Sequence, residues 1–141
     1  MKIFRSAILG LAVAGSSAAY AAEEPVKVVY HLTQGIEEAT RALRNIRNHL
    51  EADPTAKIVV VTNGGGIDFL LEGAEFAKGS KFTGPIGELA NRGVQFRVCQ
   101  NTLTTREISA DRVAMEATVV PSGVAEAARL QAREKFVYLK P

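Results

Sequence analysis

Hydrophobic residues along the chain alternate between two spacings, one typical of strands and the other typical of helices. The apolar, β-branched segment 26–32 predicts a first strand, and apolar residues recurring every three or four positions predict an amphipathic helix over 36–50. Its polar positions are expected to form an ordinary solvated face: Glu37, Glu38, Arg41, Arg44 and Arg47. The continuous apolar run 58–61 is typical of a parallel strand that is buried on both faces.

The remainder of the chain continues this alternation of helices and strands. Helices are predicted over 67–77 with an interruption at Gly73, over 85–91, over 102–108 with Asn101 as its cap, from Ser109 to Met115, and over 124–133 after Ser122-Gly123. Further strands are predicted over 94–99, 118–120 and 136–140. Because such alternation implies βαβ units, we expect a single α/β domain over 22–141, a flavodoxin-like three-layer sandwich around a mostly parallel five-stranded sheet.

The first residues have the three parts of a secretory signal peptide. Lys2 and Arg5 form a positive region, 7–15 is apolar, and Ala19-Tyr20-Ala21 matches a cleavage site. We expect residues 1–21 to be removed and the protein to work in the periplasm. The apolar run is shorter than the roughly 20 residues that a membrane-spanning helix needs, so no membrane association is expected.

Charge argues against a nucleic-acid partner. Without Lys2 and Arg5, the 17 basic residues become 15 and equal the 15 acidic residues. Nucleic-acid binding depends on neutralising phosphates with a basic surface, which such a balance does not favour. No cofactor is expected either.

Cys99 is the only cysteine, and it lies where a predicted strand meets a helix. An unpaired thiol in an exported protein indicates either an intermolecular bond or a reactive sulfur. The start of a helix favours the thiolate and lowers the pKa, and Arg97, one strand period away, would favour it further. The alternative is an inert thiol that fills core space, since free cysteine is often buried.

Other candidate residues follow the predicted strands, because ligands of parallel sheets gather at the carboxyl ends of the strands. The candidate ligand-binding residues are His31, Asn63, Gly64, Gly65, Asn101, Thr102 and Ser122. The run Asn63 to Gly66 suggests a phosphate cradle, but it lacks the P-loop pattern, and a flexible turn is the simpler interpretation. One cysteine and two histidines offer too few ligands for a zinc centre, so no metal is expected.

The segment from Gly93 to Leu103 that surrounds Cys99, followed by Arg106 and Ile108, resembles the DsrE/DsrF-like family, also called YchN-like. Ile86-Gly87-Glu88-Leu89, the turn 119–123 and the closing 138–141 support the resemblance. It implies a flavodoxin-like subunit that forms trimers or hexamers and carries sulfur as a persulfide. That role maps onto Cys99, with a sulfur donor or acceptor protein as the partner.

Three functions are therefore left open by the sequence. The first is an exported sulfur carrier of the sulfurtransferase type, in which Cys99 accepts and passes on sulfane sulfur. The second is a noncatalytic oligomeric module that binds a small ligand or supports assembly, with Cys99 as packing. The third is a redox partner that forms mixed disulfides through Cys99.

Overall fold

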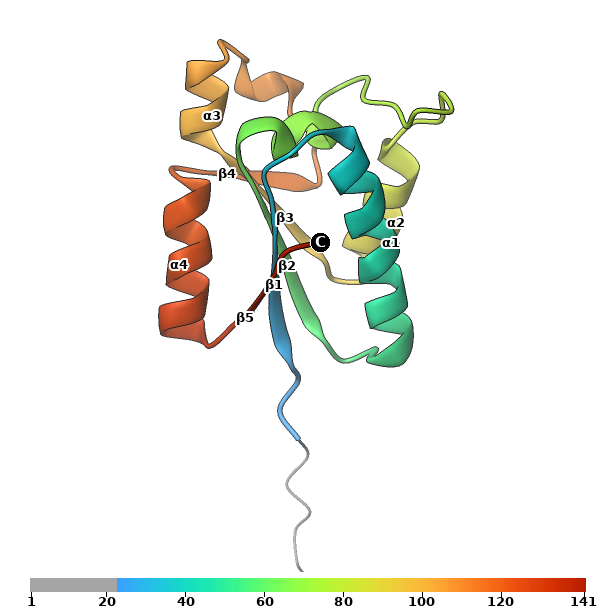
Figure 1. Ribbon diagram of the computed structural model, residues 1–141, viewed down its shortest axis with the longest axis vertical. Helices are drawn as coiled ribbons and strands as arrows, with labels where there is room; N and C mark the ends of the chain where they lie inside the picture. The colour runs from blue at the N-terminus through green and yellow to red at the C-terminus, as the bar shows by residue number, and fades with distance from the viewer. Residues whose placement is uncertain (1–22) are drawn as a thin grey trace, which may run out of the picture.

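A single parallel sheet forms the middle layer of the domain (Figure 1). A computed structural model describes residues 23–141, so the predicted signal peptide lies outside the described residues. Within them the five strands are β1 (Lys27–Leu32), β2 (Lys57–Thr62), β3 (Gln95–Cys99), β4 (Ala117–Val120) and β5 (Val137–Leu139). They lie in the order β4-β3-β2-β1-β5, and every pair is parallel. This confirms the predicted α/β class and the flavodoxin-like architecture.

Helices cover the two faces of the sheet unequally. The helical elements are α1 (Ile36–Ala52), α2 (Thr83–Asn91), α3 (Gln100–Thr105) and α4 (Gly123–Glu134), with 3₁₀ segments η1 (Gly64–Leu70) and η2 (Ala110–Arg112). Figure 1 shows α1 and α2 on one side of the sheet and α4 on the other. The chain steps from β1 to β4 in one direction, and α4 then leads back across the sheet to β5. In the described part of the chain, no helix is long and apolar enough to cross a membrane.

The main hydrophobic core lies between the sheet and the α1 side. Phe69 of η1 is 1% exposed, and its ring packs edge-on against Phe82 and Phe96 at centroid distances of 5.7 and 6.1 Å. The α4 side holds a smaller cluster, with buried residues Val29, Val59, Val61, Ala127 and Leu130. The strands are apolar on both faces because helices cover both, as parallel sheets require.

Two of the predicted helices are wrong. Instead of a helix over 67–77, the glycines after β2 begin the 3₁₀ segment η1, which ends at Leu70. Leu71 then pairs with Val113 in an antiparallel bridge, and Gly73 adopts a φ of +82° that breaks any helix. In place of the helix predicted from Ser109 to Met115, the structure has only the short η2. The segment cannot continue as a helix because Val113 pairs with Leu71 in the same bridge.

Glu38 does not lie on a solvated helix face, contrary to the sequence-based prediction. It is 2% exposed, and its carboxylate accepts hydrogen bonds from the N–H groups of Thr33 at 2.7 Å and Gln34 at 2.6 Å. Lys140, just after β5, pairs with the same carboxylate. Burial raises the pKa of Glu38, but the hydrogen bonds from Lys140, Gln34 and Thr33 outweigh burial and lower that pKa below its usual value.

Candidate functional site

Cys99 lies at the carboxyl end of β3, where the chain turns directly into α3. It is the N-cap of that helix, so α3 begins at Gln100 rather than after Asn101 as predicted. The thiol borders a surface pocket of about 360 Å³. The residues that line this pocket are Asn63, Gly64, Cys99, Asn101, Thr102, Thr105, Arg106, Ser122 and Val124. The fold therefore brings six of the eight predicted site residues to one place.

The surroundings of the Cys99 thiol favour its ionised form. The residue is 4% exposed, and this burial raises the pKa of the thiol. Hydrogen bonds from the N–H of Gly123, from the hydroxyl and N–H of Thr102, and from the N–H of Asn101 outweigh burial and lower the pKa below its ordinary value. These donors come from the starts of two helices, where N–H groups lack partners within the helix. The result is a nearly enclosed thiol with a polar wall.

Thr102 connects the thiol to the loop after β2. Its Oγ1 accepts a hydrogen bond from the N–H of Gly64 at 3.0 Å, which leaves the hydroxyl hydrogen free to point to Cys99. Arg106, one turn further along, donates to the Gly64 carbonyl at 3.2 Å and to Asp68 Oδ1 at 2.6 Å. Together these bonds attach η1 to the segment that carries the thiol.

The start of α4 packs closely over Cys99. A Cβ atom on Gly123 would lie 3.0 Å from the carbonyl oxygen of Thr62, 3.2 Å from Cβ of Asn63 and 3.3 Å from Cβ of Cys99. A side chain at this position would have to displace these neighbours, so glycine lets the start of α4 lie close to the thiol. Ser122 caps the helix as predicted, since its hydroxyl accepts from the N–H of Ala125 at 3.3 Å.

His31 and Gly65 do not line the pocket, unlike the other six predicted site residues. His31 lies behind it, where Nε2 contacts Asn63 Oδ1 at 2.6 Å and Nδ1 contacts the Tyr138 hydroxyl at 2.9 Å. Gly65 belongs to a packing contact, because a Cβ there would lie 3.2 Å from the Gly35 nitrogen. At the next position, Gly66, a Cβ would lie 2.1 Å from the Leu32 carbonyl oxygen. This close approach to the end of β1 accounts for the two glycines.

Sequence reasoning misplaced one residue and missed three. Arg97 does not serve the thiol, because it pairs with Glu126 of α4 and donates to Gln95 at 2.7 Å. The pocket residues that were missed are Thr105, Arg106 and Val124. Helical spacing contains the signal for two of them, since positions 102, 105 and 106 share one face of a helix. Val124 gave no signal, because its place depends on how α4 docks.

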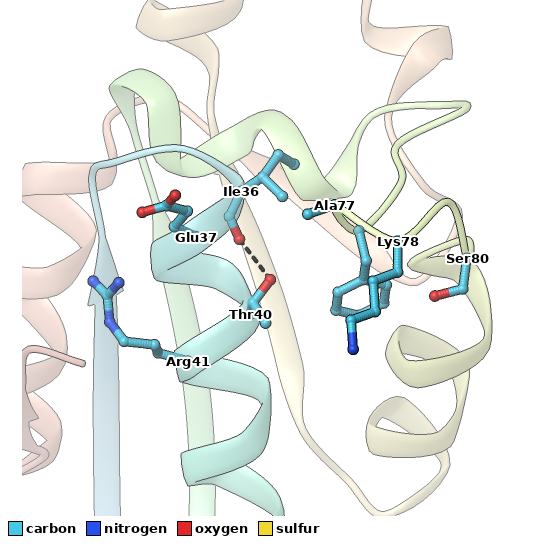
Figure 2. A pocket seen from close by; sticks show the side chains of 8 residues that line it. Ile36, Glu37, Thr40, Arg41, Ala77, Lys78 and Ser80 are labelled. Carbon is cyan, nitrogen blue, oxygen red and sulfur yellow. Dashed lines mark hydrogen bonds between the residues drawn. The ribbon is translucent and has the colours of Figure 1, made fainter.

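A larger pocket, of about 520 Å³, lies away from the cysteine between the start of α1 and the loop after η1. Figure 2 shows Ile36 and Thr40 on the side of α1 nearest to Ala77 and Lys78 of the loop, whereas the Arg41 side chain points away from the loop. The Thr40 hydroxyl donates to the Ile36 carbonyl oxygen at 2.8 Å. Its lining holds no thiol or histidine. Within residues 23–141, no three His, Cys, Asp or Glu side chains gather in a way that would hold a metal ion.

The fold and the site define a class: a small, doubly wound α/β domain with a hydrogen-bonded cysteine at the carboxyl edge of its sheet. The chain belongs to the DsrE/DsrF-like family, whose model matches residues 15–138. The family predicted from the segment around Cys99 is thereby confirmed. No curated protein matches the chain.

Solved structures that share this fold include MTH1491 and the ychN protein. MTH1491, a protein of unknown function from Methanobacterium thermoautotrophicum, is 29% identical with a TM-score of 0.74, over 82% of this chain and 99% of that chain. The ychN protein from E. coli is 15% identical with a TM-score of 0.64, over 84% of this chain and all of that one. The second likeness concerns the fold alone.

Proposed function

We propose that this protein is a sulfur carrier that holds sulfane sulfur as a persulfide on Cys99. The thiolate attacks the outer sulfur of a donor persulfide, R–S–SH, and a new S–S bond forms as the donor bond breaks. The donor leaves as the thiolate R–S⁻, and Cys99 becomes Cys–S–SH with no net oxidation or reduction. An acceptor thiolate then takes the outer sulfur by the same exchange and restores the Cys99 thiolate.

The observation that carries this proposal is the set of donors aimed at the Cys99 sulfur. Three backbone N–H groups and the Thr102 hydroxyl lower the pKa of the thiol, which raises the fraction of thiolate available at neutral pH. A packing cysteine needs no such set. A persulfide anion would use the same donors, and the adjoining pocket of about 360 Å³ has room for an added sulfur. Family membership supports the same function, because sulfur relay is what the resemblance implies.

Intact mass measurement after incubation with a low-molecular-weight persulfide tests the proposal. We expect one added sulfur atom on the purified protein, removed by reducing agent and absent from Cys99→Ser. Thr104→Ser is a matched control, because it changes an exposed hydroxyl residue on the same helix and should load normally. A wild-type mass that stays unchanged over the full range of donor concentrations contradicts sulfur transfer.

The second candidate is the oligomeric binding or assembly module, and the 4% exposure of Cys99 is the observation in its favour. Alkylation with iodoacetamide separates the two functions. If the protein is a sulfur carrier, Cys99 should be alkylated in the native state, and the rate should increase as the pH rises through a thiol pKa that is lower than the ordinary value. A packing cysteine reacts slowly at alkaline pH when native and quickly only after unfolding. A mixed disulfide with another protein, seen on nonreducing gels and lost in Cys99→Ser, would indicate the redox function.

Export and assembly complete the proposed function. Residues 1–21 act as a signal peptide, so the protein isolated from the periplasm begins at Ala22, which N-terminal sequencing checks. The subunits form a trimer or hexamer, in agreement with exposed apolar residues along the edge strand β5, where Val137 is 54% and Leu139 is 38% exposed. Light scattering that finds only monomer at high concentration contradicts the assembly. A partner protein is expected to act as the sulfur donor or acceptor.

A further inference from the structure

Four polar side chains form a row across the face of the sheet that α4 covers. Tyr138 comes from β5, His31 from β1 and Cys99 from β3, while Asn63 directly follows β2. Their strands are neighbours in the order β3-β2-β1-β5, and the register pairs Val29 with Tyr138 and His31 with Val61. Because side chains alternate along a strand, this register places all four on one face.

The contacts along the row have a direction. His31 Nε2 lies 2.6 Å from Oδ1 of Asn63, and an amide oxygen can only accept, so Nε2 carries a hydrogen and donates it. In the neutral ring, Nδ1 then accepts from the Tyr138 hydroxyl, which lies 2.9 Å away. The two rings also pack edge-on at a centroid distance of 5.7 Å. His31 is thus held at both nitrogens.

This arrangement decides which end of the Asn63 amide is available to the pocket. The oxygen is bound to His31, so the NH₂ group is the part of the amide left to serve the pocket that Asn63 lines together with Cys99. Asn63 and Cys99 are adjacent, since a Cβ on Gly123 would lie 3.2 Å from one Cβ and 3.3 Å from the other. A negatively charged sulfur is stabilised by donors and opposed by an amide oxygen. The amide orientation therefore matters to the thiol.

We propose that His31, held by Tyr138, is a positioning residue that fixes the Asn63 amide so that its NH₂ group faces the sulfur on Cys99. The role of this donor in holding transferred sulfur rests on the proposed function. The orientation itself can be tested on the free thiol. It links the C-terminal edge strand to a site three strands away in the sheet.

The test is the pH dependence of Cys99 alkylation by iodoacetamide, measured on the full folded protein. His31→Ala should move the midpoint upward by about 1 to 2 pH units, the effect of misdirecting one hydrogen bond to an ionised group. His31→Gln should restore the wild-type midpoint, because a glutamine NH₂ can donate to the same oxygen. Asn63→Ala should match His31→Ala, and the double variant should shift no further.

A second tyrosine–histidine pair provides the matched control. The Tyr30 hydroxyl contacts His49 Nδ1 at 3.0 Å, and the rings pack edge-on at 6.1 Å, on the opposite face of the sheet. His49→Ala and Tyr30→Phe should therefore leave the Cys99 midpoint unchanged. If the His49 and Tyr30 variants shift the alkylation midpoint as much as the His31 and Asn63 variants do, the shifts reflect a general loss of structure and the proposal is overturned.

Other outcomes also decide the matter. An unchanged midpoint in His31→Ala with native thermal unfolding, or fully additive shifts in the double variant, overturns the positioning role. If His31→Ala does not fold, Tyr138→Phe decides, because the proposal requires its midpoint to rise. A wild-type protein that takes up no sulfur, while His31→Ala still shifts the midpoint, refutes sulfur transfer but supports the positioning of Asn63.

Discussion

The two faces of the sheet are built differently although the same strands form them. On the α1 side, buried apolar residues from several strands and helices form one large core. In this core the ring of Phe69 packs against the rings of Phe82 and Phe96. On the α4 side, the apolar cluster has five buried residues, and the carboxyl end of that face carries the row that includes His31 and Cys99. One face mainly supplies stability, and the other holds the reactive group.

This division has a physical reason. Burying apolar area is the largest favourable contribution to folding, and the larger core lies on the face that two helices cover. The single helix on the other face leaves its N-terminus over the strand ends, where free N–H groups favour an anion. Substitutions on the two faces should therefore affect different measurements.

Phe69→Ala should have the largest effect on stability and almost none on the thiol. Deleting this ring from the core is expected to lower the free energy of unfolding by about 3–5 kcal/mol, as measured by urea denaturation. The native fraction should alkylate at Cys99 with the wild-type pH profile. A changed pH profile would mean that the core on the α1 side also controls the thiol, so that the two faces of the sheet do not have separate roles.

Glu38→Gln should have a smaller effect and lower the free energy of unfolding by about 1–2 kcal/mol. The substitution removes one charge from a buried pair whose Lys140 partner is 39% exposed. The pKa of Glu38 is lowered in the folded state, so its stabilising contribution is complete above the unfolded value of about 4.3 and is lost as the pH falls through the folded value. The difference in stability between wild type and Glu38→Gln should shrink on acidification. Urea denaturation at pH 7 and at successively lower pH measures this difference, and a difference that grows instead would contradict the assignment.

Gly123→Ala should affect both measurements at once, because the added Cβ meets backbone and side-chain atoms at 3.0–3.3 Å. We expect a loss of about 1–2 kcal/mol in the free energy of unfolding and a higher midpoint for Cys99 alkylation, since the Gly123 N–H moves away from the sulfur. Gly84→Ala in α2 is the matched control, because nothing lies within 4 Å of its Cβ position. It should stabilise the protein slightly and leave the thiol unchanged.

Thr102→Val should have the smallest effect on stability, about 1 kcal/mol, because it removes the hydroxyl that accepts from Gly64. The same hydroxyl donates to Cys99, so the midpoint of alkylation should rise by about 1 to 2 pH units. Thr104→Val, on the exposed side of α3, should change neither quantity. An unshifted midpoint in Thr102→Val would show that the Thr102 hydroxyl does not stabilise the Cys99 thiolate.

The order of strands and helices was predictable because it depends on local periodicity, which a single sequence displays directly. The predicted helices at 67–77 and 109–115 were wrong, because Leu71 and Val113 bridge to each other and override local preference. Six of the eight predicted site residues line the Cys99 pocket, since each follows a strand and parallel strands end at one edge. His31 and Gly65 also follow strands, but His31 hydrogen-bonds to Asn63 and Tyr138 outside the pocket lining, and Gly65 packs against the loop after β1.

The sequence by itself determined the fold class, the family and the position of the cysteine at the end of a strand, because these depend on periodicity and on residue order. Only the tertiary structure decided what surrounds that cysteine. Three contacts in this structure join elements that are distant in sequence. The Gly123 N–H donates to Cys99, Arg97 pairs with Glu126 rather than with the thiol, and Glu38 is buried with Lys140. Such contacts are set by how helices dock on the sheet, and no local pattern in the chain records that docking.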